Sequence, residues 1–179
     1  MSQALIDFLL TRGRAIILED YESTSCIAST RIAMEVLRSR DIEVRPQAVA
    51  VEALNRQAVL DAERAADAPG LGAWIVACEA TGNLDRAENS WDGHLVAIFE
   101  DAKGEVLLDL SADQFARPAK GIHAEPLAIR IKGWPLGWRW PNGSAIAYRP
   151  AKTRSYRQST NWRDGRWRPT LDRIMAEAP

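Results

Sequence analysis

The sequence predicts an α+β fold in which helices come first and an antiparallel sheet follows. Apolar residues recur at helical spacing up to residue 40. Beyond the break at residues 69–72, Pro-Gly-Leu-Gly, the chain changes to short apolar runs separated by compact turns. Helices followed by a run of strands are typical of the α+β class. The 179 residues, 46% of them hydrophobic and 26% charged, suit a single globular domain.

Two helices are expected in the first forty residues. Residues 2–11 carry apolar side chains at helical spacing, and this helix is expected to end at Arg12-Gly13. An apolar stretch at 15–18 then leads into a polar loop at 19–25, which ends in good helix-capping residues. The segment from Cys26 to Arg40 is strongly amphipathic and predicts a second helix, with Cys26 in its first turn.

The remaining elements are mainly strands. A strand at 47–54 is expected directly after Pro46, followed by a helix at 55–66 that Asn55 caps. Further strands are predicted at 73–78, 94–100, 105–110, 127–132 and 144–148. The compact turn at 101–104 predicts that the second and third of these form an antiparallel hairpin. The tryptophan-rich segment 133–143 is expected to be a loop.

Charge divides the chain into an acidic body and a basic tail. Residues 1–148 hold 15 basic and 21 acidic side chains, whereas 149–179 hold 8 basic and 3 acidic ones. We therefore expect residues 1–150 to form the domain and 151–179 to pack on it as a tail. Trp162 and Trp167 would be buried, with Arg163, Arg166 and Arg168 close to carboxylates of the body. A basic, aromatic tail also suits nucleic acid, but the net charge of −1 makes that partner unlikely.

The sequence favours a cytoplasmic protein without a membrane span. No apolar run approaches the roughly 20 residues that cross a bilayer, and the first ten residues lack the basic start of a signal peptide. Two cysteines are too few for a disulfide-built scaffold, so Cys26 and Cys78 are expected to be free thiols. Cys78 lies in an apolar run and is expected to belong to the core.

Three residues stand where a nucleophilic thiol needs them. Cys26 begins a helix, whose free N–H groups and dipole stabilise a thiolate. His94 opens a strand just after a glycine, whereas the other histidine, His123, lies in a loop. Counting outward from the hairpin turn places His94 diagonal to Asp109, a lone carboxylate in an apolar run that requires a partner. We predict that Cys26 attacks, His94 moves the proton and Asp109 orients the imidazole.

This layout resembles the papain-like and transglutaminase-like cysteine fold, which includes arylamine N-acetyltransferases and many bacterial peptidases and amidases. Residues 25–31, 91–96 and 107–114 also look like segments of an uncharacterised group of bacterial and phage proteins. That resemblance spans most of residues 23–165 and assigns no substrate. It implies a nucleophile helix packed on an antiparallel sheet. The activity implied is that of a cysteine hydrolase or acyltransferase acting on an amide, peptide or thioester bond, without metal or cofactor.

One position departs from the papain-like pattern. Papain-like proteases carry a Gln a few residues before the Cys as oxyanion donor, but residues 19–22 here are Glu-Asp-Tyr-Glu. Tyr21, Gln114 or the Cys26 backbone N–H would have to replace that donor. The substrate is expected to be a peptide, a protein or an acyl-carrying molecule. Residues expected to contact it are Tyr21, Trp91, Gln114, Trp134 and Trp138.

Two alternatives use the same residues differently. One Cys, one His and one Asp suffice for a zinc ion with a bound water, but the chain has no CxxC, HxxxH or HExxH spacing. The second alternative is a non-catalytic module on the same fold that binds a partner or nucleic acid. No oligomeric state is predicted by the pattern.

Overall fold

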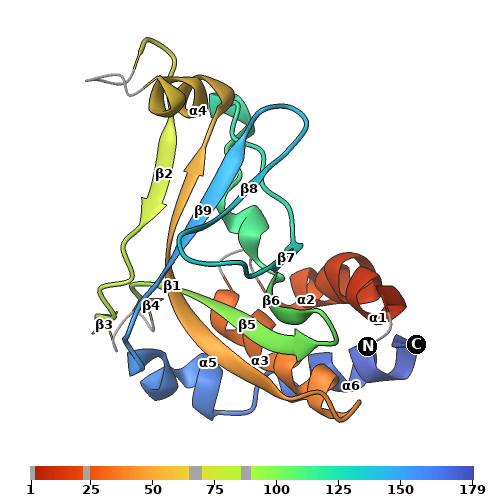
Figure 1. The fold of residues 1–179 in the computed structure, drawn as a ribbon. Helices are drawn as coiled ribbons and strands as arrows, with labels where there is room; N and C mark the ends of the chain where they lie inside the picture. Colours follow the sequence, from red (N-terminus) through yellow and green to blue (C-terminus); the bar gives the residue numbers. More distant parts are fainter. Residues whose placement is uncertain (1–2, 22–24, 65–69, 86–89) are drawn as a thin grey trace.

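A long strand, β1 (Val44–Leu54), runs through the middle of the fold and pairs along both edges (Figure 1). The computed structural model describes residues 3–21, 25–64, 70–85 and 90–179. Strand β5 (His94–Asp101) pairs with the first half of β1, and β2 (Ile75–Cys78) pairs with the second half on the same edge. Strand β9 (Ala145–Pro150) occupies the opposite edge of that second half. The first half of β1 therefore has one edge without a partner strand.

The other strands extend this sheet outward. The order is β7-β6-β5-β1-β9-β8, with β2 as the seventh strand, and every pairing is antiparallel. The outer strands are β6 (Gly104–Asp109), β7 (Leu127–Arg130) and β8 (Leu136–Arg139). A separate ribbon consists of β3 (Leu84–Asp85) and β4 (Ser90–Trp91). The hairpin of β5 and β6 has the predicted register, because Asp101 faces Gly104 and Ala97 faces Leu108.

The sheet curls into a near-barrel. In a flat sheet, β6 and β9 would lie three strand spacings of about 4.8 Å apart. The Tyr148 hydroxyl on β9 nevertheless donates a hydrogen bond of 2.8 Å to the Asp109 carboxylate on β6. Both side chains therefore point to the concave inner face, which the curvature closes around them. This arrangement of helices and antiparallel sheet confirms the predicted α+β class.

Most of the helices cover the outer face of the sheet (Figure 1). They are α1 (Gln3–Phe8), the π-helical turn η1 (Leu9–Gly13), α2 (Arg14–Asp20), α3 (Cys26–Arg38) and α6 (Arg168–Glu177). Two other helices are α4 (Arg56–Glu63), at the far end of β1, and α5 (Thr160–Arg163). Short 3-10 turns are η2 (Ala112–Phe115), η3 (Pro118–Lys120) and η4 (Ser155–Gln158). Within the described ranges, no helix is long and apolar enough to span a bilayer.

Strand alternation separates two cores. On β5, Ala97 and Phe99 face the helices, while Val96 faces the inner side of the sheet. The helix-side core includes Leu9, Ile16, Ile17, Ile32, Leu37, Phe99, Leu108 and Ile174. The inner core includes Val51, Val96, Leu107, Phe115, Leu136, Trp140, Ile146 and Tyr148.

Three boundaries differ from the sequence predictions. The first helix does not end at Gly13, because η1 carries the helical path directly into α2, where Ile16 and Ile17 are buried. Strand β1 begins before Pro46, whose register partner is Ala97. Proline is tolerated there because its missing N–H faces the unpaired edge of β1. Finally, the supposed loop 133–143 contains β8, which pairs with β9.

The C-terminal segment shares the helix-side core. The Trp167 side chain is 6% exposed and packs in that core, with Trp162 partly buried beside it. Arg31 lies over both indole rings, 4.9 Å and 5.1 Å from their centroids. The charges are arranged differently from the prediction. Among the described residues it is Arg173, and not the three arginines at 163, 166 and 168, that pairs with carboxylates of the body, Glu19 and Asp20.

We expect Trp167→Ala to destabilise the protein by about 3–5 kcal/mol, since it empties a large volume in a closed core. The matched control is Trp138→Ala, because Trp138 is 46% exposed and its loss should cost less than about 1 kcal/mol. Urea unfolding followed by circular dichroism measures both free energies. Equal losses in the two variants would contradict the burial of the C-terminal segment.

Candidate active site

A buried imidazole and a buried carboxylate form the centre of the candidate site. His94 is the first residue of β5 and Asp109 the last residue of β6, so the hairpin brings both to one end. His94 Nε2 lies 2.7 Å from Asp109 Oδ2, and both side chains are 0% exposed. The Phe115 ring packs edge-on against the imidazole at 5.0 Å between centroids. The diagonal contact predicted from the hairpin count is therefore present in the fold.

Asp109 receives two further sets of hydrogen bonds. The Tyr148 hydroxyl donates to Oδ2, the oxygen that also faces His94. The Ser111 backbone N–H and hydroxyl donate to Oδ1 at 2.9 Å and 3.3 Å. A carboxylate removed from water needs such donors, because unpaired burial of its charge is costly. With both oxygens bound, Asp109 has a fixed orientation against the imidazole.

The pair favours the charged form of both partners. Burial by itself lowers the pKa of His94, but the Asp109 charge and hydrogen bond outweigh it and raise the pKa from 6.5 to about 10. For Asp109, burial raises the pKa, while the charge and hydrogen bond of His94 exceed that effect and lower it. The Tyr148 pKa is raised well above 10, first by burial and then by Asp109. At neutral pH the site thus contains an imidazolium beside a carboxylate.

Helix α3 places Cys26 beside His94. The Thr30 hydroxyl donates a 2.7 Å hydrogen bond to the Leu95 carbonyl, which attaches the first turns of α3 to the start of β5. Cys26 lies one turn before Thr30 and therefore on the same side of the helix. After the charge and hydrogen bond of Asp109, the nearby Cys26 thiol is a smaller cause of the raised pKa of His94. The fold thus brings the start of α3, which carries Cys26, to the end of β5 where His94 contacts Asp109.

Gln114 is a further polar residue at this site. Its side-chain amide hydrogen-bonds His94 Nδ1, the ring nitrogen that does not face Asp109. When Nδ1 carries a proton, a half-turn of the same amide presents its oxygen as acceptor instead. Gln114 is held by its neighbour Asp113, which pairs with the buried Arg14 at 2.7 Å.

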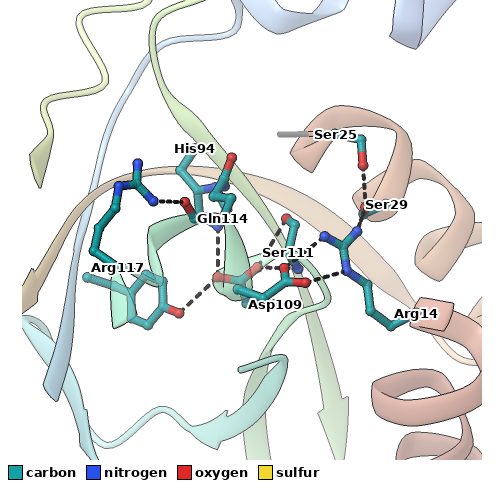
Figure 2. A network of polar contacts seen from close by, with 10 residues as sticks. Arg14, Ser25, Ser29, His94, Asp109, Ser111, Gln114 and Arg117 are labelled. Atoms are coloured by element: carbon teal, nitrogen blue, oxygen red, sulfur yellow. Dashed lines mark hydrogen bonds and ion pairs between the residues drawn. The ribbon is translucent and has the colours of Figure 1, made fainter. Parts of the chain in front are cut away.

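Arg14 connects the helix layer to the site. Its guanidinium donates to Ser29 on α3 at 3.1 Å as well as to Asp113 on η2 (Figure 2). Ser29 in turn lies 3.4 Å from the Ser25 hydroxyl, oxygen to oxygen, at the start of α3. This network fixes the turn that carries Gln114 against the helix that carries Cys26.

Trp91 packs against the buried cluster that contains Cys26. Buried residues Cys26, Ile27, Ala48, Leu95 and Tyr156 form a small group, here named the thiol cluster, and Trp91 is partly buried against it. The indole lies directly on Gly93, because a Cβ there would come within 2.4 Å of the ring. The indole N–H donates to Ser155 at 2.9 Å. The glycine before His94 is therefore used for close packing by the chain itself.

Other predicted site residues lie elsewhere. Tyr21 packs against the helix-side core, and burial is the first cause of its raised pKa. Trp134 packs against the inner core, and Trp138 lines a cavity of about 580 Å³ beside α4. Cys78 is half-buried on β2, where two neighbours are exposed, so it is less enclosed than predicted. Burial still raises the pKa of the Cys78 thiol.

The described residues contain no group of three or more His, Cys, Asp or Glu side chains that would hold a metal ion together. Comparison of the chain with protein-family models, with curated proteins and with solved structures gave no match. The geometry of the site therefore carries the functional argument.

Sequence reasoning missed several supporting residues. The contact of Ser111 with Asp109 could have been predicted from the local sequence, because an aspartate side chain commonly accepts a hydrogen bond from the N–H two residues further on. For Tyr148 the sequence indicates only that a hydroxyl in a buried strand requires a hydrogen-bond partner. Arg14 and Asp113 are 99 positions apart and had no signal at all.

We expect the stability contributed by His94 to be lost as the pH rises. A raised pKa means that the folded state binds the proton more tightly, so this contribution is complete below about pH 6.5 and disappears as the pH passes through about 10. Asp109→Asn removes the charge that raises the pKa. The gap in free energy of unfolding between wild type and this variant should therefore narrow from neutral pH to about pH 10. Urea unfolding at several pH values measures the gap, and a constant gap would contradict the charged pair.

Proposed function

We propose that the protein is a cysteine-dependent hydrolase or acyltransferase that acts on an amide, peptide or thioester bond. The observation that supports this most is the single imidazole that contacts Asp109 at 2.7 Å on one side and interacts with the Cys26 thiol. Covalent catalysis by a thiol uses a nucleophile, a group that carries the proton and a group that orients the proton carrier. The resemblance to papain-like and transglutaminase-like enzymes points to the same chemistry.

The first half of the reaction forms a thioester. Cys26 Sγ attacks the substrate carbonyl carbon as a thiolate paired with the His94 imidazolium, which already holds the proton. The raised pKa of His94 favours this imidazolium, whose charge stabilises a neighbouring thiolate. As the bond to the leaving nitrogen, oxygen or sulfur breaks, His94 gives the proton to that atom.

The second half restores the thiol. A water, or an acceptor amine in a transfer reaction, attacks the thioester carbonyl and passes a proton to His94. The carbon–sulfur bond then breaks and the proton returns to the Cys26 sulfur. Asp109 remains ionised throughout and holds the imidazole in place.

The start of α3 is suited to bind the oxyanion. The hydroxyl of Ser25, the N-cap residue, accepts no hydrogen bond from the backbone N–H groups of the first turn, so these groups lack that acceptor. These donors lie next to the attacking sulfur, where negative charge develops on the carbonyl oxygen. Gln114, which hydrogen-bonds His94, is the side chain of the predicted donors that lies at this site.

Substrate entry requires a cover to move. Cys26 is 6% exposed and His94 is fully buried, so a carbonyl group reaches the sulfur only after local opening. Trp91 is partly buried against the thiol cluster, as are Ala151 and Trp162, and a hydrogen bond to Ser155 holds its indole N–H. We assign it as the side chain that moves aside and then contacts the substrate.

The same burial favours a second candidate function. A His–Asp pair with 0% exposure is also a sound structural element, and in that case the chain is a non-catalytic binding module. The two functions differ in the reactivity of Cys26.

In the enzyme, Cys26 should react with iodoacetamide faster than Cys78 at about pH 7, because His94 is next to Cys26 while burial raises the pKa of Cys78. His94→Gln should slow labelling of Cys26 and leave Cys78 unchanged. Mass spectrometry of tryptic peptides measures both rates, and thermal unfolding verifies that the variant is folded. Faster labelling of Cys78 in the native protein would favour the binding module.

Turnover tests the covalent step itself. Cys26→Ser should reduce hydrolysis of p-nitrophenyl esters and of simple thioesters to background while the protein stays folded, since serine is well tolerated at a helix start. Asp109→Asn should retain a weaker activity, reduced by about a hundredfold or more, because the carboxylate orients the imidazole without reacting. Full activity in folded Cys26→Ser would remove the mechanism.

A further inference from the structure

A basic cleft adjoins the thiol cluster. It has a volume of about 590 Å³ and lies between residues 45–48 of β1 and residues 150–157. Ala48 and Tyr156 belong both to its wall and to the buried cluster around Cys26. A molecule in this cleft would therefore lie next to the elements that hold the thiol.

The charged side chains that line the cleft are all positive. Four cationic side chains and no carboxylate contribute to its lining: Arg45, Lys152, Arg154 and Arg157. Arg45 is paired with Glu105 at 2.9 Å, just outside the cleft. Among the described residues, the other three have no ion-pair partner, and all three are exposed. Cations left unpaired along a concave wall attract anionic groups.

The cleft wall is held in place by the ribbon that carries Trp91. Thr153 and Ser155 hydrogen-bond each other at 2.9 Å, and Ser155 donates to the Gly82 carbonyl. Gly82 has a positive φ of 79°, and a Cβ at this position would lie 2.1 Å from the Thr153 hydroxyl oxygen. Ser155 also accepts a hydrogen bond from the Trp91 indole N–H. The cleft wall is therefore connected to the side chain that packs against the thiol cluster.

Backbone pairing is not the way a ligand binds here. The Ala151 N–H donates to the Ala48 carbonyl, so Ala48 turns its backbone groups to this edge of β1. Alternate residues of a strand face the same edge, and Pro46 therefore faces it too. A proline offers no N–H, which disfavours addition of a strand along this edge. Recognition is left to the charged side chains.

Nucleic acid fits the cleft less well than a peptide does. Base binding needs exposed aromatic faces, and the one aromatic residue that lines the cleft, Tyr156, is 3% exposed. Guanidinium groups, in contrast, pair well with carboxylates, in a bidentate manner. The three unpaired cations follow one another along the wall formed by residues 150–157, which suits several carboxylates along one chain.

We infer that the cleft binds the carboxylate side chains of an acidic peptide whose amide or acyl group reacts at Cys26. The reaction of this peptide at Cys26 rests on the proposed function, whereas its binding in the cleft does not.

Fluorescence anisotropy with a labelled peptide of alternating Glu and Gly tests the binding. The wild type should bind it about tenfold tighter than the matching Gln peptide, and more weakly at high salt. Lys152→Gln/Arg154→Gln should lose about tenfold in affinity. The matched control, Arg56→Gln/Arg139→Gln, removes two positive charges from the cavity beside α4 that Trp138 lines. It should bind the peptide within about twofold of wild type.

Three results would overturn the inference: no preference for Glu over Gln, an equal loss in the control variant, or tighter binding of a single-stranded oligonucleotide through the same residues. The unlabelled Glu peptide should also slow alkylation of Cys26, and unchanged alkylation would refute its position beside the thiol. Cys26→Ala should bind the peptide as wild type does. An inert thiol with intact peptide binding would reject the proposed enzyme alone, whereas a reactive thiol without peptide binding would reject the acidic substrate alone.

Discussion

The ion pair of His94 and Asp109 is the contact on which the centre of this protein depends. Both groups are fully buried, and each is stable as an ion only because the other is present. The pair joins β5 to β6, and Tyr148 on β9 adds the hydrogen bond that spans the curled sheet. Removal of either partner leaves an uncompensated charge in the interior. The curvature of the sheet brings the Tyr148 hydroxyl to this pair, and the bound carboxylate sets the orientation of the imidazole.

A second buried charge connects this centre to the helices. Arg14 reaches from α2 to Ser29 on α3 and to Asp113 on the turn after β6. Because Asp113 precedes Gln114, the guanidinium also sets the position of the amide that contacts His94. Helix α3 is thereby fixed at two points, by Arg14 and by the Thr30 hydrogen bond to Leu95. Such a doubly attached helix start keeps Cys26 beside the imidazole.

The Cys26 thiol is buried, and the basic cleft lies next to the elements that hold it. Trp91 covers the thiol cluster, and the hydroxyl of Ser155 ties it to the wall of the basic cleft. Occupation of the cleft by an acidic chain would act on the same segment that holds the indole. In the function we propose, this short stretch of chain therefore links the substrate-binding cleft to the position of Trp91.

By itself, the sequence determined the features that depend on near neighbours: the helix that begins at Cys26, the Asn55 cap, and the register of the hairpin that sets His94 near Asp109. These follow from periodicity, capping and turn geometry over a few residues. Tertiary structure alone decided the rest. Tyr148 meets Asp109 only because the sheet curls, and Arg14 meets Asp113 across 99 positions. Distant pairings of this kind arise when buried charges require partners, and local patterns do not encode which partner the fold supplies.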